Sequence, residues 1–140
     1  MFFKKRKTKR RKRTPSKHYL EHKELARALV HERLEYWNQL YQFEYNRVSI
    51  KNQKTCWGSC SEHGNLNFNY KVIFLPHALM DYIIVHELCH RAELNHSPAF
   101  WSHVERAIPE YREHRSHLKR MTHIPQKGFP SSIFALQEIK

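Results

Sequence analysis

The chain has 140 residues and a formal net charge of +12, from 25 Lys and Arg against 13 Asp and Glu. A chain of this length can form one hydrophobic core, so we expect a single domain. No apolar run is long enough for a signal peptide or a membrane-spanning helix, and we expect a cytoplasmic protein that does not contact a membrane. The three cysteines, an odd and low number, agree with a reducing compartment.

The positive charge is concentrated at the beginning of the chain. Residues 1–17 hold ten Lys or Arg and no acidic residue, whereas the remainder has 15 basic and 13 acidic residues. We expect a disordered basic arm over 1–17, a folded domain over 18–120 and an irregular tail over 121–140. Such an arm can bind the phosphate backbone of a nucleic acid, and it also suits a solubilising tail or a targeting signal.

A long helix is predicted at the start of the domain. Thr14-Pro15-Ser16 is typical of a helix start, with Thr14 or Ser16 as the cap and Pro15 in the first turn. His18 and His22 lie four residues apart, but their charged surroundings and the lack of a third ligand argue against a metal site there. Apolar residues at helical spacing then continue to about Phe43, namely Ala26, Val30, Leu34, Trp37 and Tyr41, with Leu25, Leu29 and Leu40 widening the stripe.

The middle of the chain predicts a small antiparallel sheet. Val48 and Ile50 alternate with polar residues, and so do Leu66, Phe68 and Tyr70. We interpret Gly58-Ser59 as a turn and 62–65 as a hairpin connection. A short apolar run, 72–75, ends at Pro76. Cys56 and Cys60 are separated by three residues, so packing or turn geometry explains them better than a zinc knuckle with two intervening residues.

The stretch 81–96 is helix-forming and contains the pattern His-Glu-x-x-His at His86, Glu87 and His90. Zinc hydrolases carry this pattern on a helix. In this chain we expect that helix to begin near Pro76. Residues four apart are rotated by only about 40°, so His86 and His90 can bind one ion together. Glu87 flanks the ion and can take a proton from the hydrolytic water. The alternative is a buried structural pair of histidines.

His96 is the candidate third ligand. Catalytic zinc takes three protein ligands and keeps one position open, and three histidines supply that number. We expect Asn95 to end the helix in a left-handed turn that brings His96 back toward the pair.

Two further helices are expected after this site. Ser97-Pro98 opens the first, which runs to about Ala107 before Pro109, and the second covers 110–120. Its Tyr111, His114 and Leu118 can face the core. Arg112, Arg115, Lys119 and Arg120 form a second basic surface. The group that stabilises the oxyanion is left open among Tyr82, His103, Tyr111 and Arg112.

Three motifs in order carry a resemblance to a known family: residues 53–61 (Gln-Lys-Thr-Cys-Trp-Gly-Ser-Cys-Ser), residues 64–69 (Gly-Asn-Leu-Asn-Phe-Asn), and residues 85–101 around His86 and His96. Over about residues 20–120 the chain resembles the YgjP-like metallopeptidase domain family, small zincins similar to SprT and WLM domains. The usual N-terminal β region of that family looks shortened and replaced by the basic arm. Metzincins share the ligand spacing, but they have a glycine where this chain has Glu93.

The resemblance implies an α+β fold: a small zincin-like domain with a long N-terminal helix, a small antiparallel sheet, an active-site helix and C-terminal helices. It also implies one zinc ion (Zn2+) per chain, bound by His86, His90 and His96, with Glu87 as general base.

We therefore expect a zinc metallopeptidase that acts on a peptide or protein, held as an extended segment by the strand near 66–69. Two alternatives stay open. A metal-dependent nucleotide phosphohydrolase would clamp phosphates with Arg or Lys, although the chain has only three glycines and no phosphate loop. A nucleic-acid-binding module with a structural metal would have no need of Glu87.

Overall fold

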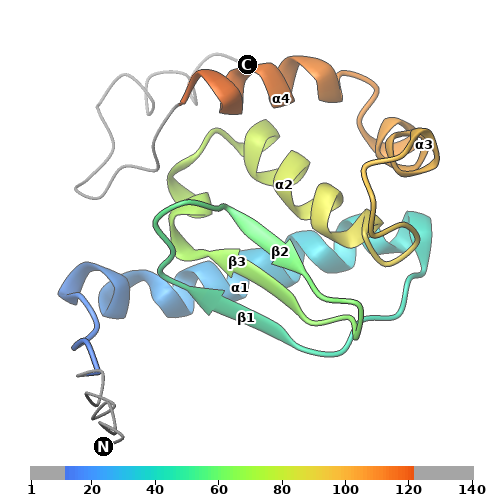
Figure 1. Ribbon diagram of the computed structural model, residues 1–140. Helices are drawn as coiled ribbons and strands as arrows, with labels where there is room; N and C mark the ends of the chain where they lie inside the picture. Colours follow the sequence, from blue (N-terminus) through green and yellow to red (C-terminus); the bar gives the residue numbers. More distant parts are fainter. Residues whose placement is uncertain (1–11, 122–140) are drawn as a thin grey trace, which may run out of the picture.

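The computed structural model describes residues 12–121, and these form an α+β fold in which helices surround a small sheet (Figure 1). Most of the predicted basic arm (1–11) and nearly all of the predicted tail (122–140) lie outside the described residues. None of the helices within 12–121 combines the length and apolarity needed to cross a membrane. The predicted α+β class with a long first helix is confirmed.

Helix α1 (Lys17–Tyr41) begins directly after Ser16, whose side chain accepts a hydrogen bond from the Tyr19 N–H at 3.2 Å. Pro15 therefore precedes the helix instead of lying in its first turn. The helix ends at Gln42 (φ 54°), whose N–H donates to Asn38 O at 2.7 Å. The predicted stripe is buried at Ala26, Val30, Leu34 and Tyr41 and half-buried at Trp37, whereas Leu25 and Leu40 are exposed.

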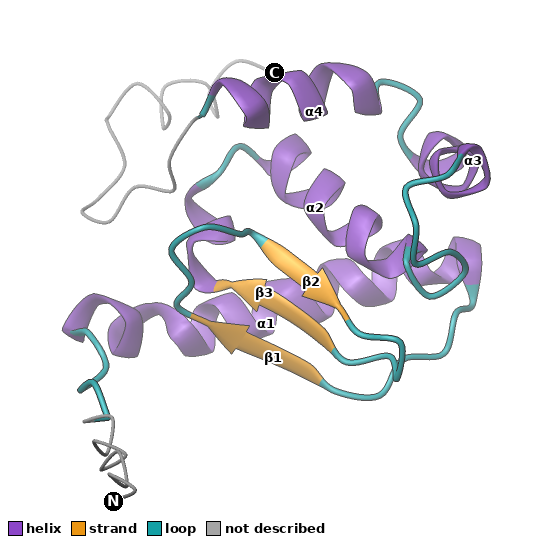
Figure 2. Ribbon diagram, viewed as in Figure 1, coloured by secondary structure: helices purple, strands orange, loops and turns teal. Residues whose placement is uncertain are grey.

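The sheet contains β1 (Val48–Lys51), β2 (Gly58–Cys60) and β3 (Leu66–Asn69), in the order β1-β3-β2 (Figure 2). β2 pairs antiparallel with β3 through a hairpin at 62–65, where Gly64 has φ +85°. β1 and β3 are parallel. The sheet is thus mixed and not wholly antiparallel as predicted. After the hairpin, β3 lies between the other two strands and runs in the same direction as β1. The predicted turn at Gly58-Ser59 is also wrong, since both residues belong to β2.

A 3-10 helix, η1 (Tyr70–Phe74), joins the sheet to α2 (His77–Cys89). Most of the apolar run at 72–75 therefore belongs to a 3-10 helix and not to a strand. The buried Asn69 side chain accepts from the Lys71 N–H at 3.1 Å and donates to Gln53 O at 2.8 Å and Cys56 O at 3.2 Å. One buried amide thus connects the end of β3 to the loop before β2.

Helix α2 lies at the centre of the molecule, between the sheet, α1 and α4 (Figure 1). Nine of its thirteen residues are buried, so it packs against neighbours on almost every side. Arg33 of α1 donates to Asp81 through two hydrogen bonds of 2.8 and 2.9 Å, which ties the two helices together. The sheet adds Ile50, Leu66 and Phe68 to the same core.

The end of α2 differs from the prediction. The helix stops at Cys89 and not at Asn95, and among residues 12–121 Gln42 is the only non-glycine residue with positive φ. The chain turns instead through hydrogen bonds that span three residues and not four, as in a 3-10 helix. They run from the His90 N–H to Glu87 O (3.3 Å) and from the Arg91 N–H to Leu88 O (3.0 Å). The loop that follows returns His96 to the helix.

Two short helices, α3 (Pro98–Ala107) and α4 (Tyr111–Arg120), complete the described chain. Ser97 caps α3 by accepting from the Phe100 N–H at 3.3 Å, as the Ser97-Pro98 pattern predicts. Phe100 and Val104 of α3 and Tyr111 of α4 are buried, while the basic side of α4 is exposed.

Candidate metal centre

Three histidine rings meet beside α2. His86 and His90 are one turn apart on the helix, and their Nε2 atoms are 3.3 Å apart. The Nε2 atom of His96 lies 3.1 Å from that of His86. One nitrogen from each ring lies within 4.8 Å of the others, which leaves a position that all three could share in binding one metal ion. The structure therefore brings together all three histidines singled out from the sequence.

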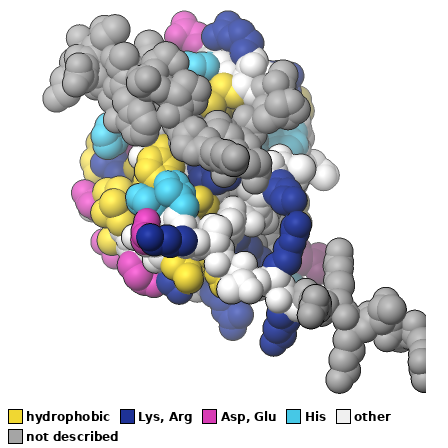
Figure 3. Space-filling model, turned by 90° about the vertical axis from the view of Figure 1, so that its left-hand side faces the viewer, with side chains coloured by type: hydrophobic (Ala, Val, Ile, Leu, Met, Phe, Trp, Pro, Cys, Tyr) yellow, Lys and Arg dark blue, Asp and Glu magenta, His cyan; other side chains and the backbone are white. Residues whose placement is uncertain are grey.

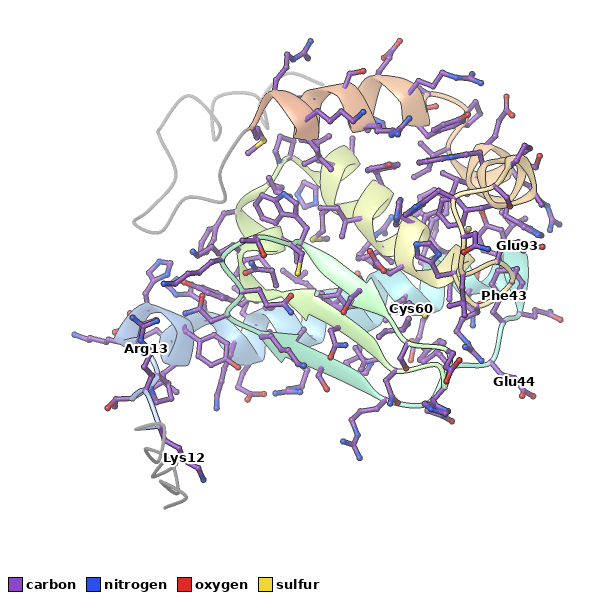
Figure 4. All side chains as sticks on the ribbon, viewed as in Figure 1. Lys12, Arg13, Phe43, Glu44, Cys60 and Glu93 are labelled. Carbon is purple, nitrogen blue, oxygen red and sulfur yellow. The ribbon has the colours of Figure 1, made fainter. Side chains whose placement is uncertain are left out.

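The surroundings of His90 leave its Nε2 free to bind a metal. Its Nδ1 lies 2.9 Å from the carbonyl oxygen of Glu93, a residue of the loop after α2 (Figure 4). A carbonyl only accepts, so Nδ1 carries the proton and Nε2 has a free lone pair. The Phe100 ring stacks on His90 at 4.4 Å between centroids and 21° between planes. The ring orientation of His90 is thus held by a hydrogen bond and by packing.

The other two histidines have aromatic neighbours as well. His86 Nδ1 lies 3.4 Å from the Tyr82 hydroxyl, and the ring of His96 stacks on Trp101 at 5.9 Å. These contacts orient the rings, while exposed His96 leaves the group open to solvent. Histidine side chains also lie beside hydrophobic ones on the surface that Figure 3 shows, which is the left-hand side of Figure 1.

Burial keeps the first two histidines neutral. It lowers the pKa of His86 to about 3, with further lowering by the charges of His90, His96 and Arg115. Burial also lowers the pKa of His90. Neutral imidazole is the form that binds a metal, so the chemistry of these donors fits a divalent transition metal such as zinc.

Glu87 is next to this group and is 7% exposed. Burial raises the pKa of its carboxyl group to about 8. It lines the same cavity as His86 and His96 and lies against Gly58 of β2. A carboxyl group with a pKa near neutrality can both accept and return a proton at physiological pH.

The cavity beside the histidines has a volume of about 390 Å³. Of the four candidates for stabilising an oxyanion, only Tyr82 lines it. Arg112 borders a different depression, and Tyr111 is buried against the Trp101 ring at 5.0 Å. The lining residues are Trp57, Gly58, Tyr82, Ile83, His86, Glu87, His96, Trp101, Arg115, Leu118 and Lys119.

The sequence did not place some of these residues at the site. Gly58 was expected in a turn, and Arg115 and Lys119 were expected only as part of a basic surface. The tryptophan of residues 53–61, Trp57, was the available signal, because a large aromatic side chain between small residues often lines a site.

The remaining sequence candidates do not join the metal group. Within residues 12–121, His86, His90 and His96 form the only group of three or more His, Cys, Asp or Glu side chains with this spacing. His18 instead hydrogen-bonds through Nδ1 to the Tyr70 hydroxyl at 2.8 Å. Cys56 and Cys60 are free thiols whose pKa is raised, first by burial and then by Glu87.

The α+β fold with a three-histidine group beside its central helix is that of a metallopeptidase domain. The chain belongs to the YgjP-like family, whose metallopeptidase domain matches residues 3–121. This confirms the resemblance seen in the sequence, and the match extends into the basic arm. No curated protein matches the chain.

A solved structure supports the same class. The metallopeptidase zymogen abylysin of Pyrococcus abyssi is similar to this chain with a TM-score of 0.59 and 26% sequence identity. The similarity covers 66% of this chain and 93% of abylysin. Family and fold together support a metal-dependent peptidase.

Proposed function

We propose that the chain is a zinc-dependent peptidase in which His86, His90 and His96 bind one zinc ion and Glu87 is the general base. The observation that carries this proposal is the convergence of three imidazole nitrogens within 4.8 Å beside a buried carboxyl group at a cavity. Structural zinc sites use four protein ligands, whereas catalytic sites use three. The three donors found within 12–121 suit the catalytic type.

The proposed reaction divides the chemistry between the ion and Glu87. Zinc, when bound, supplies a Lewis acid that polarises the scissile carbonyl and lowers the pKa of water. Glu87 takes a proton from the attacking water and delivers it to the leaving amine, which the raised pKa of its carboxyl group favours. Trp57, Tyr82 and Trp101 line the cavity and give it aromatic walls.

The strand proposed to hold the substrate is β2. The expectation that 66–69 would do so is wrong, because β3 is the central strand and is paired on both sides. β2 is an edge strand that lines the cavity at Gly58. Trp57 and Ser61 hydrogen-bond toward β3, through the Asn69 N–H to Trp57 O (2.8 Å) and the Ser61 N–H to Asn65 O (3.0 Å). By alternation, Gly58 and Cys60 direct their backbone groups to the free edge, where an extended peptide can pair.

A second function remains a candidate because of two cations. Arg115 and Lys119 line the cavity, and such side chains also clamp phosphates. A nucleoside triphosphatase is therefore tested beside the peptidase. The cytoplasmic location and the binding of nucleic acid by the arm stay predictions.

The test combines metal analysis with hydrolysis. Wild-type protein, His96→Ala, Glu87→Gln and the control His63→Ala, which removes an exposed imidazole, are analysed for zinc and incubated with an unfolded protein and with nucleoside triphosphates. We expect one zinc per chain, at least tenfold weaker binding after His96→Ala, and retained zinc with at least a hundredfold loss of hydrolysis after Glu87→Gln. The substrate consumed distinguishes the two functions. Folded wild-type protein that binds no zinc would refute the proposal.

A further inference from the structure

One wall of the cavity is formed by α4 and carries positive charge. Arg115 and Lys119 line the cavity from positions four residues apart, which places them on the same side of α4. The guanidinium carbon of Arg115 lies 4.9 Å from the centre of the Trp101 ring. Trp101 in turn stacks on His96 with 5.9 Å between centroids. A single aromatic ring therefore links Arg115 to the histidine group.

The charge of Arg115 has no acidic partner in the part of the chain that the structure describes. Of the acidic residues on or beside α4, Glu110 pairs with His114 at 3.8 Å and Glu113 borders a different depression. Among the residues that the structure describes, Glu87 is the only carboxyl group that lines the cavity, and it is buried. A contact with an aromatic ring leaves the charge in place, so an anion from outside the described chain can still bind.

The size and the lining of the cavity limit the kind of ligand that can carry this anion. A volume of about 390 Å³ holds one or two amino-acid residues. Trp57, Trp101 and Leu118 offer apolar surface to a side chain, while the guanidinium group can form two parallel hydrogen bonds with a carboxylate. The free edge of β2 borders the same cavity at Gly58, so the group that enters it is part of an extended peptide.

We propose that Arg115, assisted by Lys119, binds a carboxylate of the substrate and makes this enzyme selective for peptides with a carboxylate beside the scissile bond. The inference rests on the proposed peptidase function and names its substrate class. The carboxylate is either the C-terminus of a peptide or the side chain of an Asp or Glu residue. Arg115 is thus a specificity-determining residue.

Matched peptide pairs test the inference. One pair differs only in a free acid or an amide at the C-terminus, next to the scissile bond, and a second pair differs only in an internal Asp or Asn. The zinc-loaded wild type is compared with Arg115→Gln, Arg115→Lys and Arg112→Gln. Arg112 is the matched control, because its guanidinium carbon also lies 4.9 Å from an aromatic ring, that of Tyr111, but it borders the other depression.

We expect wild-type protein to cleave the charged member of at least one pair about tenfold faster than its neutral partner. The pair that shows the preference identifies the source of the carboxylate. Arg115→Gln should remove the preference, mainly by raising KM for the charged peptide. Arg115→Lys should keep part of it, since lysine retains the charge without the planar fork. Arg112→Gln should keep all of it.

Binding gives a readout independent of turnover. Calorimetric titration of zinc-loaded Glu87→Gln protein should show at least fivefold tighter binding of the charged peptide, and Arg115→Gln in that background should abolish the difference. Equal cleavage of both members of each pair by wild type, or a preference that survives Arg115→Gln, would overturn the inference while leaving the peptidase function intact. Failure of the zinc-loaded wild type to cleave any peptide would overturn the proposed function and this inference with it.

Discussion

Gly58 of β2 lies directly against Glu87 of α2. A Cβ atom at position 58 would be only 2.9 Å from Glu87 Cγ and 3.0 Å from Asn67 O, closer than side-chain atoms normally approach. Only glycine lets the sheet come this near to the carboxyl group. The strand proposed to hold the peptide and the proposed general base are therefore in direct contact.

Replacing Gly58 tests this contact. Gly58→Ala should displace the Glu87 side chain and reduce hydrolysis by at least about tenfold, because small errors in the position of a catalytic group are costly. Zinc content should stay at the wild-type level, since the histidines are not displaced. Kinetic assays and metal analysis check both, with Ser49→Ala on the opposite edge strand as the control. Unchanged hydrolysis by Gly58→Ala would argue against Glu87 as the general base.

The ion pair between Arg33 and Asp81 should stabilise the packing of α1 on α2. Its two hydrogen bonds are short, and the side chains are only 26% and 17% exposed. A double-mutant cycle with Arg33→Gln and Asp81→Asn should give a coupling of about 1–2 kcal/mol in the free energy of unfolding. Urea denaturation measures it.

A second ion pair provides the comparison. Arg27 and Glu24 lie within α1 at 3.3 Å, with side chains 40% and 69% exposed. The same cycle there should give less than about 0.5 kcal/mol, because water screens exposed pairs. Equal coupling at both sites would contradict the role assigned to Arg33.

Tyr82 should support metal binding through His86. Burial raises the pKa of Tyr82 to about 12, so its hydroxyl stays neutral and can accept a hydrogen bond from His86 Nδ1. Tyr82→Phe removes the hydroxyl but keeps the ring. We expect zinc affinity to fall about three- to tenfold, as measured by competition with a chelating dye. Tyr36→Phe, at an exposed position of α1, should leave the affinity unchanged.

Lys71 should make stability depend on pH in the alkaline range. The residue is 3% exposed, and burial lowers the pKa of its ammonium group below the ordinary 10.5. The unfolded chain therefore binds more protons between the two pKa values, and stability from this group rises as pH increases toward 10.5. Lys71→Met should remove the cost of burying the charge and stabilise the protein by up to about 1 kcal/mol at neutral pH.

The comparison with wild type isolates this contribution. The difference in the free energy of unfolding between Lys71→Met and wild type should shrink as pH rises toward 10.5. Urea denaturation at several pH values measures it, and exposed Lys54→Met serves as the control. A difference that stays constant with pH would show that Lys71 is not the cause.

Local patterns predicted much of this protein. The spacing of His86 and His90 depends only on helix geometry, and the caps Ser16 and Ser97 depend on residues three positions away. The need of catalytic zinc for a third ligand pointed to His96, and the family motifs agreed with it. These features were within reach because each is set by neighbours in the chain.

The order of the strands and the walls of the cavity depended on the tertiary structure. Alternating apolar residues locate a strand but carry no information on its direction, so the parallel pairing of β1 with β3 and the edge position of β2 were missed. Nor does a helical pattern tell which partner its basic side will meet. The contact of Gly58 with Glu87 and the place of Arg115 beside Trp101 arise only when segments distant in the sequence pack together, and that packing is decided by the whole core.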